Sequence, residues 1–185
     1  MKIVGINTSP RPNSNIKIAL EKALEAAEAK GAETQIFNTN SMNISCCQAD
    51  NACKKLGGKC AVDDDMVQIY EAIESADAII FATPIYMFDF AAQAKIVMDR
   101  FYSYFMTPKA EELTPMKMSF IVSQGQEDAG LYQGIVDNYA NLFAGLFGFE
   151  IVDKEIFADN NVPAAINEKE DQLAQAVKVG ENIVG

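Results

Sequence analysis

The sequence begins with MKIVGINTSPRPNSN (residues 1–15), and this stretch decides the fold. Its apolar run at residues 3–6 is typical of a buried strand. A turn-rich loop follows, and a helical pattern then begins at Ile16, with apolar residues spaced three and four apart. A strand, a hydroxyl-rich loop and a helix in this order form an anion site in an open α/β sheet, because the loop and the helix start direct backbone N–H groups at a phosphate.

Four side chains in this loop suit a phosphate. Ser9 and Ser14 offer hydroxyl donors, Asn15 offers an amide, and Arg11 offers a fixed positive charge. The loop is neither a Walker loop nor a Gly-x-Gly-x-x-Gly dinucleotide turn, so side chains and turn amides would bind one terminal phosphate. An ordinary loop with a Ser or Asn helix cap would share some of these residues, but the four together favour the phosphate site.

Apolar strand patterns and helical patterns alternate along the rest of the chain. We expect strands at residues 2–6, 34–37, 78–82, 118–122 and 149–157, and helices at residues 14–30, 65–75, 90–104, 131–147 and 167–183. This alternation predicts an α/β fold with a five-stranded parallel sheet, helices on both faces and the flavodoxin-like strand order 2-1-3-4-5. We expect one domain over residues 1–185, with a long polar connection at residues 39–64.

Composition excludes several classes of function. The chain has 185 residues, of which 49% are hydrophobic and 22% charged, so it is globular. Its net charge of -11 makes nucleic acid and anionic membranes poor partners. No apolar run approaches the roughly 20 residues of a membrane span, and the first strand directly follows Met1 without a signal peptide, so we expect a cytoplasmic protein. The absence of histidine removes Ser-His-Asp and Cys-His catalysis, so a cofactor would supply the chemistry.

Two further loops should lie at the same edge of the sheet as the phosphate loop. Residues 83–89 (TPIYMFD) are apolar and aromatic where loops are normally polar, so we expect a flat ring to lie on them. Packing under the next helix or a subunit contact is the alternative. In residues 123–127 (SQGQE), Gly125 lets the backbone approach a ligand, and the glutamine amides can pair with the donors and acceptors of a ring.

Three motifs together resemble a known family. The runs S-P-R-P-N-S-N after the first strand, T-P-I-Y-M-F after the third and K-x-x-x-D-R in the next helix resemble the NADPH-dependent FMN reductase family, and within it the iron–sulfur flavoproteins. The resemblance implies that FMN binds with its phosphate on Ser9, Arg11, Ser14 and Asn15. It also implies that the isoalloxazine ring lies against Pro84, Ile85, Tyr86, Met87 and Phe88, with Ser123, Gln124 and Gly125 beside it.

The helix expected at residues 90–104 carries two further features. Its K-x-x-x-D-R residues, Lys95, Asp99 and Arg100, are expected to form a charge pair on the helix face rather than to take part in chemistry. Its end gathers the aromatic residues Phe101, Tyr102, Tyr104 and Phe105. Core packing is one interpretation, but we favour a surface shared between subunits of a homodimer or tetramer.

All four cysteines lie between residues 46 and 60, in the long connection. Disulfides are disfavoured in a cytosolic protein, and a zinc site of four thiolates lacks the expected pair of Cys-x-x-Cys motifs. Thiolates held close together also suit a [4Fe–4S] cluster. A redox-active thiol loop without a cluster is a further alternative.

The resemblance bears on this choice. Iron–sulfur flavoproteins carry Cys-x-x-Cys-x-x-Cys and a later fourth cysteine at this place, which makes Cys46, Cys47, Cys53 and Cys60 candidate metal ligands. This sequence departs from the motif, because Asp50 stands at its second position. Cys46 would have to replace that ligand, although adjacent side chains in an extended chain point in opposite directions. We therefore favour a plain flavoprotein with a thiol loop.

These features predict an FMN-dependent oxidoreductase that takes electrons from NAD(P)H or a protein donor and passes them to an acceptor. The alternative is an FMN electron carrier that acts between protein partners without direct NAD(P)H chemistry. For such a carrier, an acidic surface would steer a basic partner.

Overall fold

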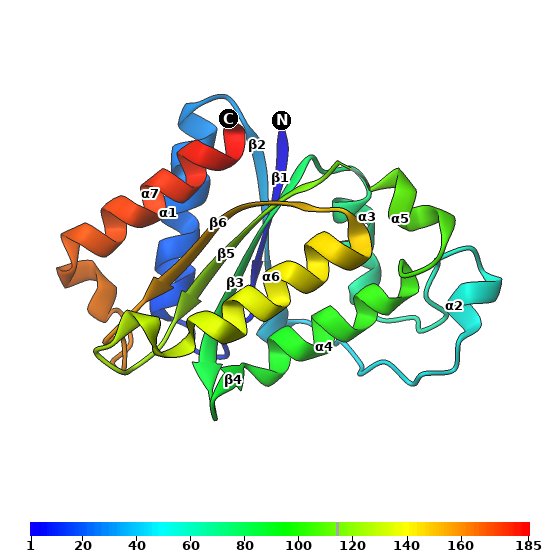
Figure 1. The fold of residues 1–185 in the computed structure, drawn as a ribbon, viewed down its shortest axis with the longest axis horizontal. Coiled ribbons are helices and arrows are strands. Elements are labelled where there is room, and N and C mark those ends of the chain that lie inside the picture. Colours follow the sequence, from blue (N-terminus) through cyan, green and yellow to red (C-terminus); the bar gives the residue numbers. More distant parts are fainter. Residues whose placement is uncertain (114) are drawn as a thin grey trace.

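The computed structural model describes residues 1–113 and 115–185, which alternate between strands and helices (Figure 1). The strands are β1 (Lys2–Asn7), β2 (Glu33–Asn38), β3 (Ala78–Tyr86), β4 (Asp89–Phe90), β5 (Lys117–Ser123) and β6 (Glu150–Phe157). The α-helices are α1 (Asn15–Ala29), α2 (Ala52–Lys55), α3 (Met66–Ile73), α4 (Ala92–Arg100), α5 (Pro108–Glu112), α6 (Gln133–Phe147) and α7 (Glu170–Val184). Short 3₁₀ helices are η1 (Thr39–Ser41), η2 (Phe101–Ser103), η3 (Ala129–Tyr132) and η4 (Ala165–Glu168).

Five parallel strands form the central sheet in the order β2-β1-β3-β5-β6. This confirms the predicted flavodoxin-like order, since β5 and β6 are the fourth and fifth parallel strands along the chain. The predicted count of five strands was one short, because β4 pairs antiparallel with the end of β3. The register places Pro84, Ser123 and Phe157 side by side on neighbouring strands. The loops that follow β3, β5 and β6 therefore begin at the same edge of the sheet.

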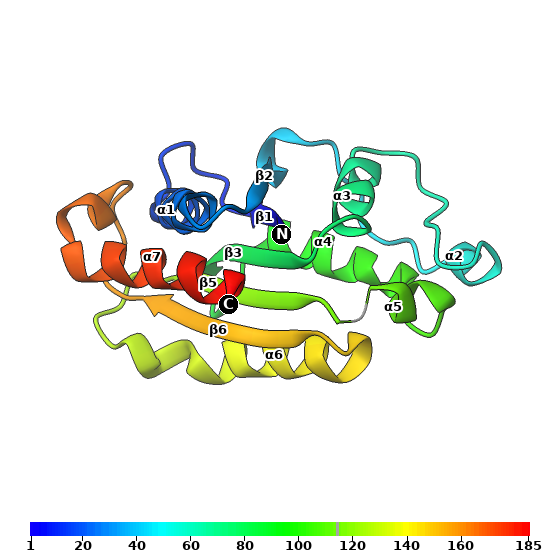
Figure 2. The ribbon, with the colours of Figure 1, turned by 90° about the horizontal axis from the view of Figure 1, so that it is seen from above.

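Helices cover both faces of this sheet. Alternate residues of the strands point to opposite faces, so Ile3, Ile80 and Ile121 pack in one core cluster with α1 and α7. Val4 and Phe81 pack in a second cluster with α3, α4 and α6. Figure 2 shows α1 and α7 on one side of the sheet and α6 on the other. The two layers were predicted, and they leave the carboxyl-terminal edge of the sheet free for a site.

The helix after β1 begins where the sequence predicted. Ser14 has extended backbone angles, and its hydroxyl oxygen accepts a hydrogen bond from the backbone N–H of Lys17, so it caps α1. The helix ends before Gly31, whose φ of 89° lies in the left-handed region that glycine adopts without strain. Another glycine, Gly180, lets α7 approach α1, because a Cβ atom there would lie 1.9 Å from the carbonyl oxygen of Ala23.

The segment expected as a loop at residues 83–89 is a strand end and a hairpin. Strand β3 continues to Tyr86, and Met87 and Phe88 form the two-residue turn that leads into β4. Both turn residues have positive φ, 47° and 66°, as the tight hairpin turn requires. Behind the turn, the ring of Phe90 stacks on that of Tyr139 with centroids 4.4 Å apart, which fixes the hairpin against α6.

The aromatic residues after α4 were interpreted as a surface shared between subunits, but two of the four lie in the core. Phe101 and Tyr104 are only 1% exposed and contact each other edge to face in the core. Phe105 is half-buried, and Tyr102 is the one of the four with an exposed fraction as high as 39%. Core packing therefore explains at least half of this aromatic cluster.

Candidate functional site

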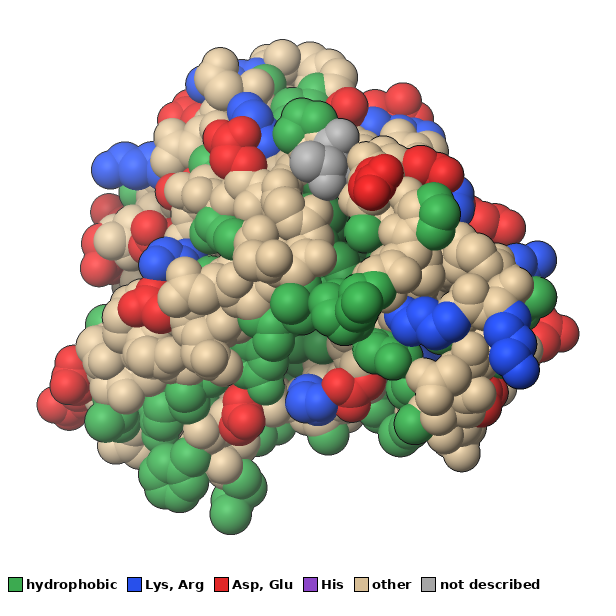
Figure 3. Space-filling view, turned by 45° about the vertical axis from the view of Figure 1, so that its right-hand side comes forward, with side chains coloured by type: hydrophobic (Ala, Val, Ile, Leu, Met, Phe, Trp, Pro, Cys, Tyr) green, Lys and Arg blue, Asp and Glu red, His purple; other side chains and the backbone are tan. Residues whose placement is uncertain are grey.

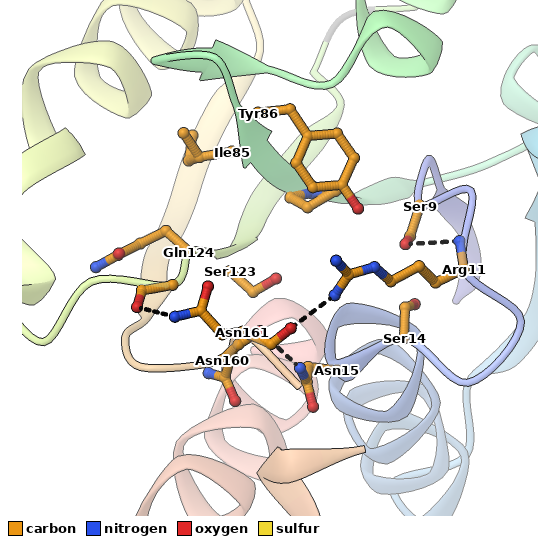
Figure 4. A pocket seen from close by; sticks show the side chains of 12 residues that line it. Ser9, Arg11, Ser14, Asn15, Ile85, Tyr86, Ser123, Gln124, Asn160 and Asn161 are labelled. Carbon is orange, nitrogen blue, oxygen red and sulfur yellow. Dashed lines mark hydrogen bonds between the residues drawn. The ribbon is translucent and has the colours of Figure 1, made fainter. Parts of the chain in front are cut away.

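A polar pocket lies at the carboxyl-terminal edge of the sheet, where the loops after β1, β3, β5 and β6 meet (Figure 4). Its volume is about 200 Å³. It is lined by Ser9, Arg11, Ser14, Asn15, Pro84, Ile85, Tyr86, Ser123, Gln124, Gly125, Asn160 and Asn161. Ten of these twelve residues are ones that the sequence singled out, and the topology of the sheet brings them together.

The loop after β1 brings two hydroxyls and a guanidinium to one end of the pocket. The hydroxyl oxygens of Ser9 and Ser14 accept backbone N–H groups of Arg11 and Lys17, at 3.3 and 3.1 Å. These bonds orient both oxygens and leave each hydroxyl proton to be donated. The guanidinium of Arg11 reaches across the pocket, and its Nη1 donates to the carbonyl oxygen of Asn161 at 2.9 Å (Figure 4). The exposed Arg11 and the first turn of α1 make this end of the pocket positive.

Asn15 lines the pocket, but its side chain already has several partners. Its Nδ2 donates to the carbonyl oxygens of Asn160 and Val162, at 3.0 and 2.8 Å. Its Oδ1 accepts the backbone N–H of Ile166 at 3.0 Å. The amide therefore ties the start of α1 to the segment after β6.

The end of β3 forms an apolar wall of the pocket. Pro84 is buried, and Ile85 and Tyr86 are half-buried, with the Tyr86 ring facing the pocket in Figure 4. Met87 and Phe88 were expected on the same surface, but they do not line the pocket. They are 90% and 74% exposed at the tip of the hairpin, which directs them away from the sheet edge.

The segment after β6 contributes two residues that the sequence analysis missed. Asn160 is 6% exposed, and its backbone N–H donates to the carbonyl oxygen of Gln124 at 2.9 Å. Asn161 donates its side-chain N–H to the carbonyl oxygen of Gly125 at 2.8 Å. The signal was present in the polar run Asp159-Asn160-Asn161 directly after the last apolar strand, because every carboxyl end of a parallel sheet meets this edge.

The four cysteines lie elsewhere, on the segment around α2 at the right of Figure 1. Cys47, Cys53 and Cys60 line a cavity of about 20 Å³. Cys46 is exposed and does not line it, whereas Asp50 does. The side chain of Asp50 accepts a hydrogen bond from the backbone N–H of Ala52 at 2.9 Å. Asp50 therefore pairs with the first N–H group of α2, the short helix that carries Cys53.

A buried ion pair closes the base of this cysteine segment. The guanidinium of Arg100 donates to both carboxylate oxygens of Asp64, at 2.7 and 3.2 Å, and to the carbonyl oxygen of Ser45 at 2.9 Å. The side chains of Arg100 and Asp64 are 0% and 2% exposed. Burial alone would raise the pKa of Asp64, but hydrogen bonds from Arg100 and Ser45 and the charge of Arg100 hold that pKa below its usual value.

This geometry corrects one expectation and confirms another. Lys95 and Asp99 form the predicted ion pair on the exposed face of α4, four residues apart. Arg100 does not belong to it. The arginine points into the protein instead and connects α4 to the two ends of the cysteine segment, residues 45 and 64.

The cysteine cavity does not fit a metal centre as it stands. Its volume has room for about one water molecule, far less than a four-iron cluster. Within residues 1–113 and 115–185, no group of three or more His, Cys, Asp or Glu side chains is placed to hold a metal ion. A metal site formed by Cys46, Cys47, Cys53 and Cys60 therefore stays a prediction.

Comparison with known proteins gives a family match. Residues 1–163 match the family described as NADPH-dependent FMN reductase. An iron-sulfur flavoprotein of Methanosarcina thermophila is 41% identical over 100 residues, which cover 54% of this chain and 52% of the relative. An iron-sulfur flavoprotein of Methanocaldococcus jannaschii is 37% identical over 100 residues, covering 54% and 51%. The chain thus spans about half the length of the curated relatives it matches.

Solved structures share the fold at low identity. The NAD(P)H:quinone oxidoreductase from Methanothermobacter marburgensis superposes with a TM-score of 0.75 at 20% identity, covering 99% of this chain and 98% of the other. A flavone reductase gives a TM-score of 0.75 at 20% identity, covering 100% of this chain and 62% of the other. Separately, no helix in the described part of the chain is long and apolar enough to span a membrane.

Proposed function

The chain belongs to the NADPH-dependent FMN reductase family, and from this premise we propose that residues 1–185 act as one FMN-binding domain with oxidoreductase activity. The observation that carries the proposal is the arrangement of the pocket. An anion-binding loop with Ser9, Arg11 and Ser14 forms one end, and the apolar wall of Pro84, Ile85 and Tyr86 forms the other. FMN needs both surfaces, since it joins a phosphate to a flat ring through a flexible polyol.

The donor set fits a phosphate monoester at the first end. The hydroxyls of Ser9 and Ser14 have free protons to donate, and the Arg11 guanidinium forms one hydrogen bond, to a neutral carbonyl. A doubly charged phosphate is a stronger acceptor than that carbonyl, because charge-assisted hydrogen bonds are about twice as strong as neutral ones. The amides in the first turn of α1 add further donors. These groups bind and orient the phosphate.

The other end suits a flavin ring. Pro84 and Ile85 offer apolar contact to one face of the ring, and the amide of Gln124 and the backbone at Gly125 offer polar contacts to its edge. When bound, FMN supplies hydride and single-electron transfer. No carboxylate, histidine or lysine is among the twelve lining residues. The chain's own residues therefore bind and orient the cofactor.

We propose that a nicotinamide nucleotide is the electron donor. Pro84, Ile85 and Tyr86 form one apolar wall of the pocket and could cover one face of a flavin, which would leave the other face for a second flat ring to stack on. A protein donor is the second candidate. The net charge of -11 favours it, because an acidic surface attracts a basic redox partner.

The proposal is tested by titrating the protein with FMN and with riboflavin, which lacks the phosphate. We expect Arg11→Ala to weaken FMN by about 1.5–3 kcal/mol, the usual worth of a hydrogen bond to a charged group, and to leave riboflavin unchanged. Lys22→Ala is the control, since Lys22 lies on the outer face of α1, the helix that follows this loop, and pairs with Glu25. Equal weakening of both flavins by Arg11→Ala would place the phosphate elsewhere.

The two donors are separated by anaerobic stopped-flow measurement on the FMN-loaded protein. Rapid bleaching of the flavin by NADH or NADPH supports the reductase. Slow bleaching by both nucleotides, with rapid and salt-dependent reduction by a basic redox protein, supports the carrier. Because the cysteine cavity does not fit a cluster, no step of this proposal passes through iron.

We also propose that the protein assembles into homodimers or tetramers. Figure 3 shows hydrophobic side chains gathered in a band across one face of the molecule. Contiguous apolar surface on a globular protein marks an interaction site more often than not. Light scattering at micromolar concentration tests this, and a stable particle of one chain would overturn it.

A further inference from the structure

The segment of residues 158–162 crosses the floor of the pocket and contacts both of its ends. The carbonyl oxygen of Asn161 accepts Nη1 of Arg11 at 2.9 Å, at the anion-binding end. The side chain of the same residue donates to the carbonyl oxygen of Gly125 at 2.8 Å, on the loop after β5. Figure 4 shows Asn161 beside the guanidinium of Arg11, with the hydrogen bond between them as a dashed line.

Asn161 and Gly125 are sterically matched. A Cβ atom at position 125 would lie 1.9 Å from Oδ1 of Asn161 and 2.5 Å from its Cγ, so no side chain fits there while the asparagine keeps its place. The glycine is therefore required by close approach, which lets the amide of Asn161 lie directly on the loop backbone. Two further backbone bonds connect the same segments, from Asn160 to Gln124 at 2.9 Å and from Asp159 to Gln126 at 2.7 Å.

The segment is also anchored from below. The side chain of Asn15 donates hydrogen bonds to the carbonyl oxygens of Asn160 and Val162, so the start of α1 anchors the segment. Asn161 itself is exposed and contributes nothing to the core. The backbone of Asn161 is therefore held by its neighbours, and its side chain makes its hydrogen bond to the loop at Gly125.

We infer that Asn161 is a positioning residue that sets the loop at residues 123–125 against the flavin ring. The inference rests on the proposed function, and it adds a residue that neither the sequence motifs nor the resemblance assigns. When phosphate binds, Arg11 exchanges the Asn161 carbonyl for the stronger anionic acceptor. The side-chain bond to Gly125 stays in place, so Asn161 acts at the ring end of the pocket and Arg11 at the phosphate end.

The test compares Asn161→Ala with the wild-type protein in FMN and riboflavin titrations and in the visible spectrum of the bound flavin. We expect both flavins to bind about two- to tenfold more weakly, the worth of one neutral hydrogen bond. We expect the ratio of the two affinities to stay the same, because the phosphate contacts are intact, and the visible bands of bound FMN to shift. Asn182→Ala is the control, since its side chain bonds Asp153 outside the pocket.

A double-mutant comparison tests the steric match. Gly125→Ala alone should weaken both flavins, because its methyl group displaces Asn161, and adding Asn161→Ala should restore part of the loss. Additive losses in the double variant would overturn the inference, as would an Asn161→Ala protein with unchanged affinity and spectrum. Wild-type protein that binds no FMN would instead overturn the proposed function and this inference with it.

Discussion

The pocket at the sheet edge and the cysteine segment are built on opposite principles. The end of β3 and the loops after β1, β5 and β6 converge on the pocket, and hydrogen bonds connect the loop after β6 to the loops after β1 and β5. The cysteine segment leaves the sheet after β2, and its two ends meet at one buried ion pair, Arg100 with Asp64, beside hydrogen bonds between residues 43–45 and 64–65. A site formed by topology tolerates the loss of a single contact. A segment whose two ends meet at one buried charge pair depends more strongly on that pair, and the predictions below test that difference.

The largest effect is expected from Arg100→Ala. This change leaves the carboxylate of Asp64 buried without its cation, and breaking a buried pair in this way costs about 3–5 kcal/mol. Urea unfolding measures the loss of stability. Limited proteolysis should show earlier cleavage within residues 46–63, while the FMN affinity of the remaining folded protein stays close to that of the wild type.

Lys95→Ala is the matched control on the same helix. Its pair with Asp99 is about half exposed on both sides, so its removal should cost no more than about 0.5 kcal/mol. If the two variants lost similar stability, the ion pair would not be what holds the segment.

The next effect is a loss of stability in acid. The folded pKa of Asp64 lies below that of the unfolded chain, so the pair contributes stability above the ordinary aspartate pKa of about 3.9, and this contribution is lost as the pH falls through the folded pKa. Urea midpoints of the wild type and of Asp64→Asn should differ at pH 7 and converge below about pH 4. A difference that stays constant down to pH 3 would contradict the assignment.

The pocket could largely be predicted from the sequence, whereas the ion pair at the base of the cysteine segment could not. Apolar runs predicted the strands and their order, and the order alone brought Ser9, Pro84 and Ser123 to one edge. Contacts between the side chains of residues far apart in the sequence could not be predicted from local patterns. Arg100 and Asp64 are 36 positions apart, and no local pattern separates a buried arginine from its exposed neighbours Lys95 and Asp99.

One misplacement, of the aromatic residues after α4, had a local cause that spacing could have revealed. Phe101 and Tyr104 are three positions apart on a helical segment, which places them on one face and indicates core packing. The outward turn of Met87 and Phe88 was harder to foresee, because turns with two positive φ angles are usually built from Asn and Gly. Bulky residues there cost strain, and the strand pairing at Ile85 and Tyr86 holds them in place.

A smaller effect is expected from two substitutions at the helix cap of the pocket. Ser14→Ala removes the cap of α1 and should cost about 1 kcal/mol of stability, together with weaker FMN binding. Ser14→Asp keeps a capping oxygen and places a negative charge where the phosphate would bind. It should retain the stability of the wild type and lose FMN, so the pair of variants separates the cap from the phosphate site. Equal FMN affinity in Ser14→Asp and the wild type would remove Ser14 from that site.

The smallest effect is expected from Cys46→Ser, and it sharpens the comparison within the cysteine segment. Cys46 is exposed and lines no cavity with the other three thiols, so its replacement should change the free energy of unfolding by less than about 0.5 kcal/mol. Cys53 is 7% exposed, and a serine there buries a hydroxyl in place of a thiol, so Cys53→Ser should cost about 1–3 kcal/mol.

The same two variants test the metal prediction. Iron and acid-labile sulfide are measured per chain after anaerobic preparation with both supplied. Wild-type protein that holds neither leaves the segment as a thiol loop, consistent with a cavity that admits one water molecule. If the wild type holds iron, Cys46→Ser should hold the same amount and Cys53→Ser less, because Cys53 lines the cavity with Cys47 and Cys60 and Cys46 does not. Loss of iron in Cys46→Ser would mean that the segment rearranges around the metal so that Cys46 joins the other three thiols.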